Sequence, residues 1–218
     1  MGATDASLPI LILGASAGIG ALTVDEAVAR GLRVRAFARS AEKIPPREGV
    51  EAMVGDIREP GDLRRALDGV RGAIYTIGIR ERVAMLWEQE TLFSESTATL
   101  IPLMLEADVK RLVAVTGFGA GRSRQAMSRI EQLGHGAVLG RVYDDKSRQE
   151  ALIMESALDW TIVRPVILTK GARTGRFKAL EQPKDWRNGL ISRKDVAVYL
   201  IDAVTKGLHI RQDIVLAR

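Results

Sequence analysis

The chain has 218 residues, of which 46% are hydrophobic and 27% charged, a composition typical of globular proteins and unlike that of disordered or collagen-like ones. It has no cysteine and only two histidines, His135 and His209, so we predict no disulfide, no cysteine nucleophile and no metal site. The 32 basic residues exceed the 27 acidic ones to give a net charge of +5, but they are spread along the chain and only 5% of residues are aromatic. We therefore expect an anionic small ligand rather than a nucleic acid.

No apolar run reaches the roughly 18 residues that a membrane helix needs. Residues 1–8 lack the basic start and apolar stretch of a signal peptide. We therefore expect no membrane association and a cytoplasmic location. Because α/β domains often reach this length as one unit, residues 1–218 are predicted to form a single domain. The oligomeric state is left open.

Short apolar runs alternate with amphipathic stretches along the chain. This pattern predicts strands near residues 9–13, 33–38, 50–54, 73–77, 111–116, 161–164 and 213–217. It predicts helices near residues 18–30, 61–67, 85–106, 144–156 and 192–206, with a kink or break at Pro102 and with Ser192 as the last N-cap. Strands separated by helices indicate an α/β fold, a Rossmann-type doubly wound parallel sheet with helices on both faces.

A glycine-rich turn joins the first predicted strand to the first predicted helix. It consists of Gly14, Ala15, Ser16, Ala17, Gly18, Ile19 and Gly20. Gly14 permits a tight turn, Gly18 lets the backbone approach a diphosphate, and Gly20 lets the helix pack closely on the sheet, while the N–H groups at the helix start face negative charge. The alternative is that these glycines serve packing alone. The position of the turn within a β-α-β unit favours dinucleotide binding.

The end of the second predicted strand distinguishes between cofactors. A site for NAD has an Asp or Glu there, which accepts hydrogen bonds from the ribose hydroxyls. This chain has Arg39, followed by Ser40 and Lys43, and these side chains suit a 2′-phosphate. The alternative is a solvated basic turn. We expect NADP, with NADPH preferred over NADH.

Several further motifs occur in the order found in a known family. They are Gly55-Asp56-Ile57, Thr76-Ile77-Gly78 followed by Arg80, Lys110–Val113 leading into Thr116-Gly117, the stretch from Lys146 through Glu150 to Thr161-Ile162-Val163-Arg164-Pro165, and Ile191–Ala197. With the glycine turn they cover nearly the whole chain. The chain thus resembles the atypical short-chain dehydrogenase/reductases, in particular the NAD(P)H-binding group that contains NmrA-like proteins and the biliverdin-IXβ/flavin reductases.

This resemblance implies where each part of the cofactor would lie. The residues that it assigns to cofactor contact are Asp56 and Ile57 beside the adenine, Thr76, Ile77, Gly78 and Arg80 along the ribose and diphosphate, Thr116 and Gly117 beside the nicotinamide, Lys146 on the ribose, and Pro165, Val166 and Ile167 after the "Thr-Ile-Val-Arg-Pro" strand.

The chain departs from the main branch of these enzymes at the catalytic positions. That branch uses a Tyr as general acid, a Lys four positions later, and a Ser at the end of the preceding strand. Here Tyr143 stands three positions before Lys146, Gly117 occupies the place of the Ser, and Thr116 is the nearest hydroxyl. The candidate catalytic residues are therefore Lys146, Tyr143 and Thr116. The alternatives are that Tyr143 has no chemical role and that Lys146 only contacts the ribose, with Glu150 as its partner one helical turn on.

Loops around residues 78–90, 117–141 and 166–190 are expected to form the substrate pocket, because ligands bind outside the carboxyl ends of strands in such sheets. Arg122, Arg124 and Arg129 in the second loop either bind an acidic acceptor or form a solvated helix face. Trp186 is a candidate for the opposite wall of the pocket, together with residues 166–177, and Trp160 is expected in the core.

Two hypotheses of function follow. The first is an NADPH-dependent oxidoreductase that transfers hydride to a conjugated small-molecule acceptor such as a flavin, quinone or bilin, because such acceptors can take protons from water. The second is a non-catalytic, NmrA-like NADP(H)-binding sensor that reports redox state to a partner. A nucleotide-sugar epimerase-like enzyme is a poorer third, since such enzymes add a substrate domain for which the chain has little room.

Overall fold

The computed structural model describes residues 7–78, 90–127 and 129–218, and over residues 129–139 it describes the backbone alone. Eight strands form one central sheet. They are β1 (Ile10–Leu13), β2 (Val34–Ala38), β3 (Val50–Val54), β4 (Gly72–Tyr75), β5 (Arg111–Val115), β6 (Asp159–Pro165), β8 (Lys178–Leu180) and β10 (Gln212–Ala217). Their order is β3-β2-β1-β4-β5-β6-β10-β8, and every pairing is parallel except that of β8 with β10.

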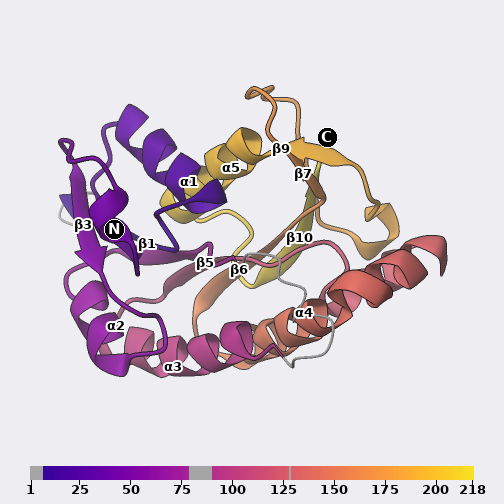
Figure 1. Cartoon of the computed structure of the whole chain (residues 1–218), viewed down its shortest axis with the longest axis horizontal. Coiled ribbons are helices and arrows are strands. Elements are labelled where there is room, and N and C mark those ends of the chain that lie inside the picture. The colour runs from indigo at the N-terminus through magenta and orange to yellow at the C-terminus, as the bar shows by residue number, and fades with distance from the viewer. Residues whose placement is uncertain (1–6, 79–89, 128) are drawn as a thin grey trace.

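Within the described ranges, five α-helices cover the two faces of this sheet. They are α1 (Gly18–Ala29), α2 (Pro60–Leu67), α3 (Leu92–Glu106), α4 (Arg129–Glu155) and α5 (Arg193–Lys206). Figure 1 shows α1 and α5 on one face and α2, α3 and α4 on the other. The predicted doubly wound α/β fold is therefore confirmed.

The first strand shows why both faces of the sheet are apolar. Ile10, Leu11, Ile12 and Leu13 are all fully buried. Successive side chains of a strand point to opposite faces, so Ile10 and Ile12 pack in the cluster on the α1 and α5 side, while Leu11 and Leu13 pack in the cluster under α2 and α3. A continuous apolar run is the pattern of a strand that is covered on both sides.

The strand order changes direction at β1. The chain runs from β1 outward through β2 to β3, and then returns to the other side of β1 as β4. The loops after β1 and β4 therefore leave the sheet in opposite directions, and ligands of doubly wound sheets bind at this switch point.

Two features differ from the predicted elements. Helix α4 begins at Arg129 rather than near residue 144, and residues 129–143 include three glycines, which lower helix propensity. Helix α3 runs unbroken through Pro102, because Leu100, Leu103 and Met104 around the proline pack into the core. The part of the predicted helix before residue 90 lies outside the described residues.

The segment between β6 and α5 contains short elements that the sequence pattern did not predict. They are β7 (Ile167–Thr169), β8, β9 (Leu190–Ser192) and the 3-10 helix η5 (Pro183–Asp185). Strands β7 and β9 pair with each other in a separate two-stranded sheet. Two further 3-10 helices are η2 (Ala41–Lys43) and η4 (Gly121–Ala126).

Candidate functional site

The glycine turn after β1 is shaped by contacts that only glycine permits. Gly14 has a φ of +88°, a conformation that other residues avoid. At Gly20, an added methyl group would lie 2.1 Å from the carbonyl oxygen of Gly14 and 2.7 Å from Oγ1 of Thr76. The first turn of α1 therefore packs directly on this loop, and the predicted packing role of Gly20 is confirmed.

The start of α1 is available to an anion. Gly18 also has a positive φ, +59°, and among the described residues no atom outside its chain neighbours and its own helix backbone lies within 4 Å of the position that a methyl group would take there. The N-cap residue Ala17 makes no side-chain capping hydrogen bond, and the first turn carries no acidic residue. The residues present thus fit a diphosphate at the positive end of the helix.

The end of β2 lies next to the glycine turn. The Ser40 hydroxyl is hydrogen-bonded to the Ser16 hydroxyl at 3.0 Å, and Arg39 and Lys43 are exposed. The structure thus brings the three residues predicted to bind a 2′-phosphate to the edge of the predicted diphosphate site.

Asp56 and Ile57, which are predicted to contact the adenine, lie in the loop after β3 and interact there with other parts of the protein. The Asp56 carboxylate accepts hydrogen bonds from the backbone N–H of Arg58 at 3.0 Å and from its guanidinium at 3.2 Å. Burial acts to raise the pKa of Asp56, but the hydrogen bonds and charge of Arg58, with the charge of Arg39, hold that pKa below its usual value. Ile57 is buried in the core, which leaves little of its side chain for an adenine.

Thr76, directly after β4, is hydrogen-bonded to the end of β1, where the glycine turn begins. Thr76 donates a hydrogen bond from Oγ1 to the Leu13 carbonyl at 2.7 Å, and its backbone N–H donates to the same oxygen. Ile77 is half-buried and Gly78 is exposed. Thr76 therefore supports the turn from below, and Arg80 lies outside the described residues.

The predicted catalytic residues meet at the end of β5. Lys146 Nζ donates a hydrogen bond to the Thr116 carbonyl at 2.6 Å and lies 5.0 Å from the centroid of the Phe93 ring and 5.7 Å from that of Tyr143. Burial of the ammonium lowers the pKa of Lys146 to about 8, against a smaller opposing effect from the Glu150 carboxylate.

Tyr143 and Gly117 fit together as a pair. A methyl group at position 117 would lie 2.8 Å from the Tyr143 hydroxyl, so the glycine makes room for this side chain. Burial raises the pKa of Tyr143, which makes its hydroxyl a weaker acid. With Lys146 Nζ directed at the Thr116 carbonyl, the arrangement differs from a Tyr–Lys proton relay.

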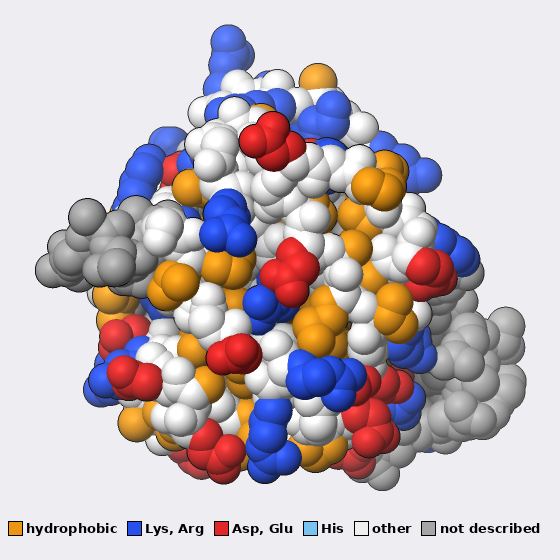
Figure 2. All heavy atoms as spheres, turned by 90° about the vertical axis from the view of Figure 1, so that its left-hand side faces the viewer, with side chains coloured by type: hydrophobic (Ala, Val, Ile, Leu, Met, Phe, Trp, Pro, Cys, Tyr) orange, Lys and Arg blue, Asp and Glu red, His pale blue; other side chains and the backbone are white. Residues whose placement is uncertain are grey.

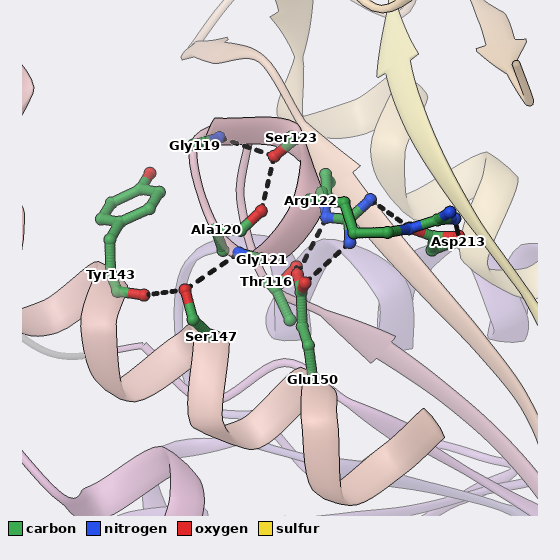
Figure 3. Close-up of polar contacts among 11 residues, drawn as sticks. Thr116, Gly119, Ala120, Gly121, Arg122, Ser123, Tyr143, Ser147, Glu150 and Asp213 are labelled. Atoms are coloured by element: carbon green, nitrogen blue, oxygen red, sulfur yellow. Dashed lines mark hydrogen bonds and ion pairs between the residues drawn. The ribbon is translucent and has the colours of Figure 1, made fainter. Parts of the chain in front are cut away.

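Thr116 is part of a buried ionic chain rather than a free hydroxyl. Its Oγ1 donates to Glu150 at 2.6 Å, and Glu150 accepts two hydrogen bonds from Arg164, at 2.9 and 2.7 Å. Arg164 also donates to Asp213 at 2.6 Å, and Asp213 accepts from Arg122 as well. Figure 3 shows these groups converging beside the loop after β5. The residues Thr116, Glu150, Arg164, Asp213 and Arg122 are called the ionic chain below.

This chain corrects one prediction. The partner of Glu150 is Arg164, not Lys146. Arg122 and Arg124, predicted either to bind an acidic acceptor or to form a solvated face, form ion pairs with Asp213 and Asp144 and stay more than half exposed; whether they bind an acceptor stays a prediction. The side chain of Arg129 is not described.

Trp186 covers the ionic chain. Its ring centroid lies 5.0 Å from the guanidinium carbon of Arg164 and 5.5 Å from that of Arg122, and its indole N–H donates to the Leu180 carbonyl. Trp186 is buried, and its place in a pocket wall stays a prediction. Trp160 is buried in the core as predicted.

The sequence analysis missed Arg164 and Asp213 as members of the site. The available signal was Arg164 itself, an arginine in a mostly apolar strand. Because a buried cation requires a carboxylate partner, this arginine predicts a buried ion pair. Which carboxylate it would be is not visible in the sequence, since Glu150 and Asp213 come from different elements.

The last predicted cofactor contacts follow β6. Pro165 and Val166 are buried, whereas Ile167 is 57% exposed. Ile167 is the register partner of Leu190, which is 56% exposed. These two apolar side chains are therefore exposed to solvent on the small sheet that β7 and β9 form.

Surface charge, possible metal ligands and the character of the helices bear on other classes of ligand. On the face at the β3 edge, basic, acidic and hydrophobic side chains are interspersed (Figure 2). No group of three His, Asp or Glu residues that could hold a metal occurs in the described part of the chain. None of the described helices combines the length and the apolar character of a membrane span.

Known proteins match this chain in sequence and in structure. It is 30% identical over 196 residues to sterol demethylase protein B of Methylococcus capsulatus and 26% identical over 212 residues to the NAD(P)H azoreductase of Xenophilus azovorans. These matches cover 84% and 93% of this chain but 55% and 65% of the relatives, so the chain spans less than two thirds of their length.

The solved structure of ChuY, an anaerobilin reductase from Escherichia coli O157:H7, superposes with a TM-score of 0.78 at 25% identity, covering 96% of each chain. A family model described as NAD(P)H-binding matches residues 14–207, which include the glycine turn, the ends of β2, β4 and β5, and α4. The chain therefore belongs to the NAD(P)H-binding family.

Proposed function

We propose that this chain is an NADPH-dependent reductase that transfers hydride to a flat, conjugated acceptor such as a flavin, a quinone or a bilin. The observation that carries the proposal is the arrangement at the carboxyl edge of the sheet. Going from β2 to β5, this edge carries Arg39 after β2, the glycine turn after β1, and Lys146, which is bonded to Thr116 at the end of β5. The relatives named as an azoreductase and an anaerobilin reductase support a reductase with a conjugated acceptor.

The cofactor would lie with its two halves on opposite sides of β1. Gly14, Gly18 and the N-terminus of α1 would hold the diphosphate, and Arg39 with Ser40 would bind the 2′-phosphate of the adenosine half. The nicotinamide half then extends over β4 and β5, where Lys146 would bind its ribose and Gly117 leaves room beside the ring. NADPH is preferred over NADH in this proposal because of Arg39.

The reduced nicotinamide supplies a hydride, and the acceptor takes this hydride together with one proton. The described residues suggest that the proton does not come from a Tyr–Lys relay, because Lys146 is bonded to a carbonyl and the pKa of Tyr143 is raised. Electron-poor conjugated acceptors fit such a site, since water or their own acidic groups can supply the proton. An acceptor bearing carboxylates or phosphates is consistent with the net positive charge.

The test is NADPH oxidation by the purified protein with FMN, a quinone, biliverdin and an azo dye, followed at the absorbance band of the reduced nicotinamide. We expect turnover with at least one of these acceptors, and slower turnover when NADH replaces NADPH. Binding of NADPH without oxidation by any of them would overturn the proposal.

A second candidate is a non-catalytic sensor of the NADP(H) redox state. It is favoured by one observation: the hydroxyl of Thr116 is committed to Glu150 and is therefore not directed at a substrate. A sensor predicts different affinities for NADP⁺ and NADPH without turnover, whereas equal affinities would contradict it.

A further inference from the structure

We propose that Arg122 is a positioning residue for the nicotinamide half of the cofactor, which it does not touch, and that it acts through the ionic chain. The proposal rests on the cofactor orientation given under Proposed function. It assigns a role in cofactor binding to a residue that is not among the predicted cofactor contacts.

The ionic chain connects Arg122 to the residues at the end of β5 without a break. Arg122 binds Asp213, Asp213 binds Arg164, and Arg164 holds Glu150 through two hydrogen bonds. Glu150 accepts from the Thr116 hydroxyl, and the carbonyl of the same Thr116 accepts from Lys146 Nζ. The position of the Lys146 ammonium is therefore set by a residue that is itself held by the chain.

Arg122 also fixes the loop that begins at Gly117. Within this loop the Ser123 hydroxyl donates to the Ala120 carbonyl at 2.7 Å and accepts from the Gly119 N–H at 2.9 Å (Figure 3). The Gly121 N–H donates to Ser147 on α4 at 2.9 Å. Arg122 adds the ion pair that joins this compact turn to β10.

The loop and the ionic chain are in direct contact at Gly121. A methyl group at position 121 would lie 1.9 Å from Oε2 of Glu150, so the backbone of the loop rests against this carboxylate. Movement of the loop would therefore change the surroundings of Glu150 and, through Thr116, those of Lys146.

Arg122 supplies one of the two guanidinium groups of the ionic chain. Two guanidinium groups, Arg122 and Arg164, face two carboxylates, Glu150 and Asp213. Burial acts to raise the pKa of Asp213, but Arg122 and Arg164 together hold that pKa below its usual value. Without Arg122, one buried cation would serve two buried carboxylates, and a buried charge that lacks its partner is costly.

Arg122 can be replaced without opening the core. Its side chain is 59% exposed, whereas those of Arg164 and Asp213 are 0% and 5% exposed. Arg124 provides a matched control, because it lies in the same 3-10 helix, is 58% exposed and pairs with Asp144, which is 51% exposed.

The test compares two ligands in wild type, R122Q, R122K and R124Q. NADPH contains both halves of the cofactor, and adenosine 2′,5′-bisphosphate contains only the adenosine half. Dissociation constants are measured for both ligands, and amide hydrogen exchange is measured over residues 117–126. Circular dichroism and the melting temperature establish that each variant is folded.

We expect R122Q to weaken NADPH binding by about three- to tenfold while leaving the affinity for the bisphosphate unchanged. Exchange in the loop should accelerate by about tenfold, R122K should recover part of the NADPH affinity, and R124Q should match wild type. Unchanged NADPH affinity in R122Q, or an equal loss for both ligands, would overturn the proposal. A wild-type protein that binds NADPH but reduces no acceptor would contradict the reductase and leave this comparison intact.

Discussion

Arg39 is the residue on which the proposed preference for NADPH over NADH depends. It is exposed at the carboxyl end of β2, beside the Ser16–Ser40 hydroxyl pair. An arginine here attracts a 2′-phosphate, whereas an Asp or Glu would bind ribose hydroxyls and repel it.

Replacing Arg39 with Asp should weaken NADPH binding by about 2 kcal/mol or more, because a charge-assisted pair is lost and repulsion is added. NADH affinity should fall much less or rise. Titration of both cofactors checks this. Arg33→Asp, at the amino end of the same strand, is the control and should bind NADPH like wild type. Equal NADPH affinity in Arg39→Asp and wild type would contradict the assignment of Arg39.

Lys146 should make NADPH binding depend on pH. Burial lowers the pKa of its ammonium to about 8, so the group is charged below that pH and neutral above it. If the charged form binds the ribose, NADPH affinity is complete below about pH 8 and declines as the pH rises through this value. NADPH affinities are measured over a range that brackets this pKa, from about pH 6.5 to about pH 9.5. They should show the decline in wild type but not in Lys146→Met. A decline of the same size in both proteins would exclude Lys146 as its source.

Among the secondary-structure elements, the close packing of α1 on the glycine turn should contribute to the stability of the protein. Gly20→Ala should destabilise the protein by about 1–3 kcal/mol, because its methyl group would lie 2.1 Å from a backbone oxygen. Gly61→Ala in α2 is the control, since no atom lies within 4 Å of its methyl position. Urea unfolding of both variants measures the difference. A Gly20→Ala variant as stable as wild type would show that the turn is not as tightly packed as described.

Helix α3 is capped by a side chain from α4. The buried Asp145 carboxylate accepts from the Phe93 N–H at 2.8 Å, from the Ser94 N–H at 3.3 Å and from the Ser94 hydroxyl. These N–H groups belong to the first turn of α3, which has no side-chain bond from its own N-cap, Thr91. The cap therefore joins two helices on the same face of the sheet.

Removing this cap should be costly. Asp145→Ala should lower the free energy of unfolding by about 2–3 kcal/mol, since buried N–H groups lose their acceptor. Asp144→Ala removes the adjacent carboxylate, which is 51% exposed, and should change stability by less than about 0.5 kcal/mol. Thermal or urea unfolding distinguishes the two variants, and equal stabilities would contradict the capping role.

The elements with a clear hydrophobic period were predictable, and contacts between distant segments were not. The apolar run at residues 9–13 and the glycines that follow it are local signals, and they predict the strand β1 and the tight turn into α1 that the structure contains. The start of α4 was missed because glycines weaken its pattern, and β7, β8 and β9 are only three residues each, too short for a period to show. The Asp145 cap and the Arg164 contacts join residues that no spacing connects.

At the scale of the whole molecule, the strand order decides where the chemistry lies. Because β2 and β4 flank β1, the glycine turn lies between the end of β2, where a 2′-phosphate is proposed to bind, and the ends of β4 and β5. The family match spans this entire edge. The ionic chain then joins the end of β5, helix α4, β6 and β10 to one another, next to the place proposed for the nicotinamide.

The central claim is that this edge holds NADPH so that its hydride passes to a bound acceptor. Anaerobic single-turnover mixing tests it directly: protein carrying one equivalent of NADPH is mixed with an excess of the acceptor, and the absorbances of nicotinamide and acceptor are followed together. The account predicts that one acceptor is reduced for each NADPH oxidised, with slower reaction in Lys146→Met. Full retention of the reduced nicotinamide in the presence of flavin, quinone, bilin and azo acceptors would contradict it.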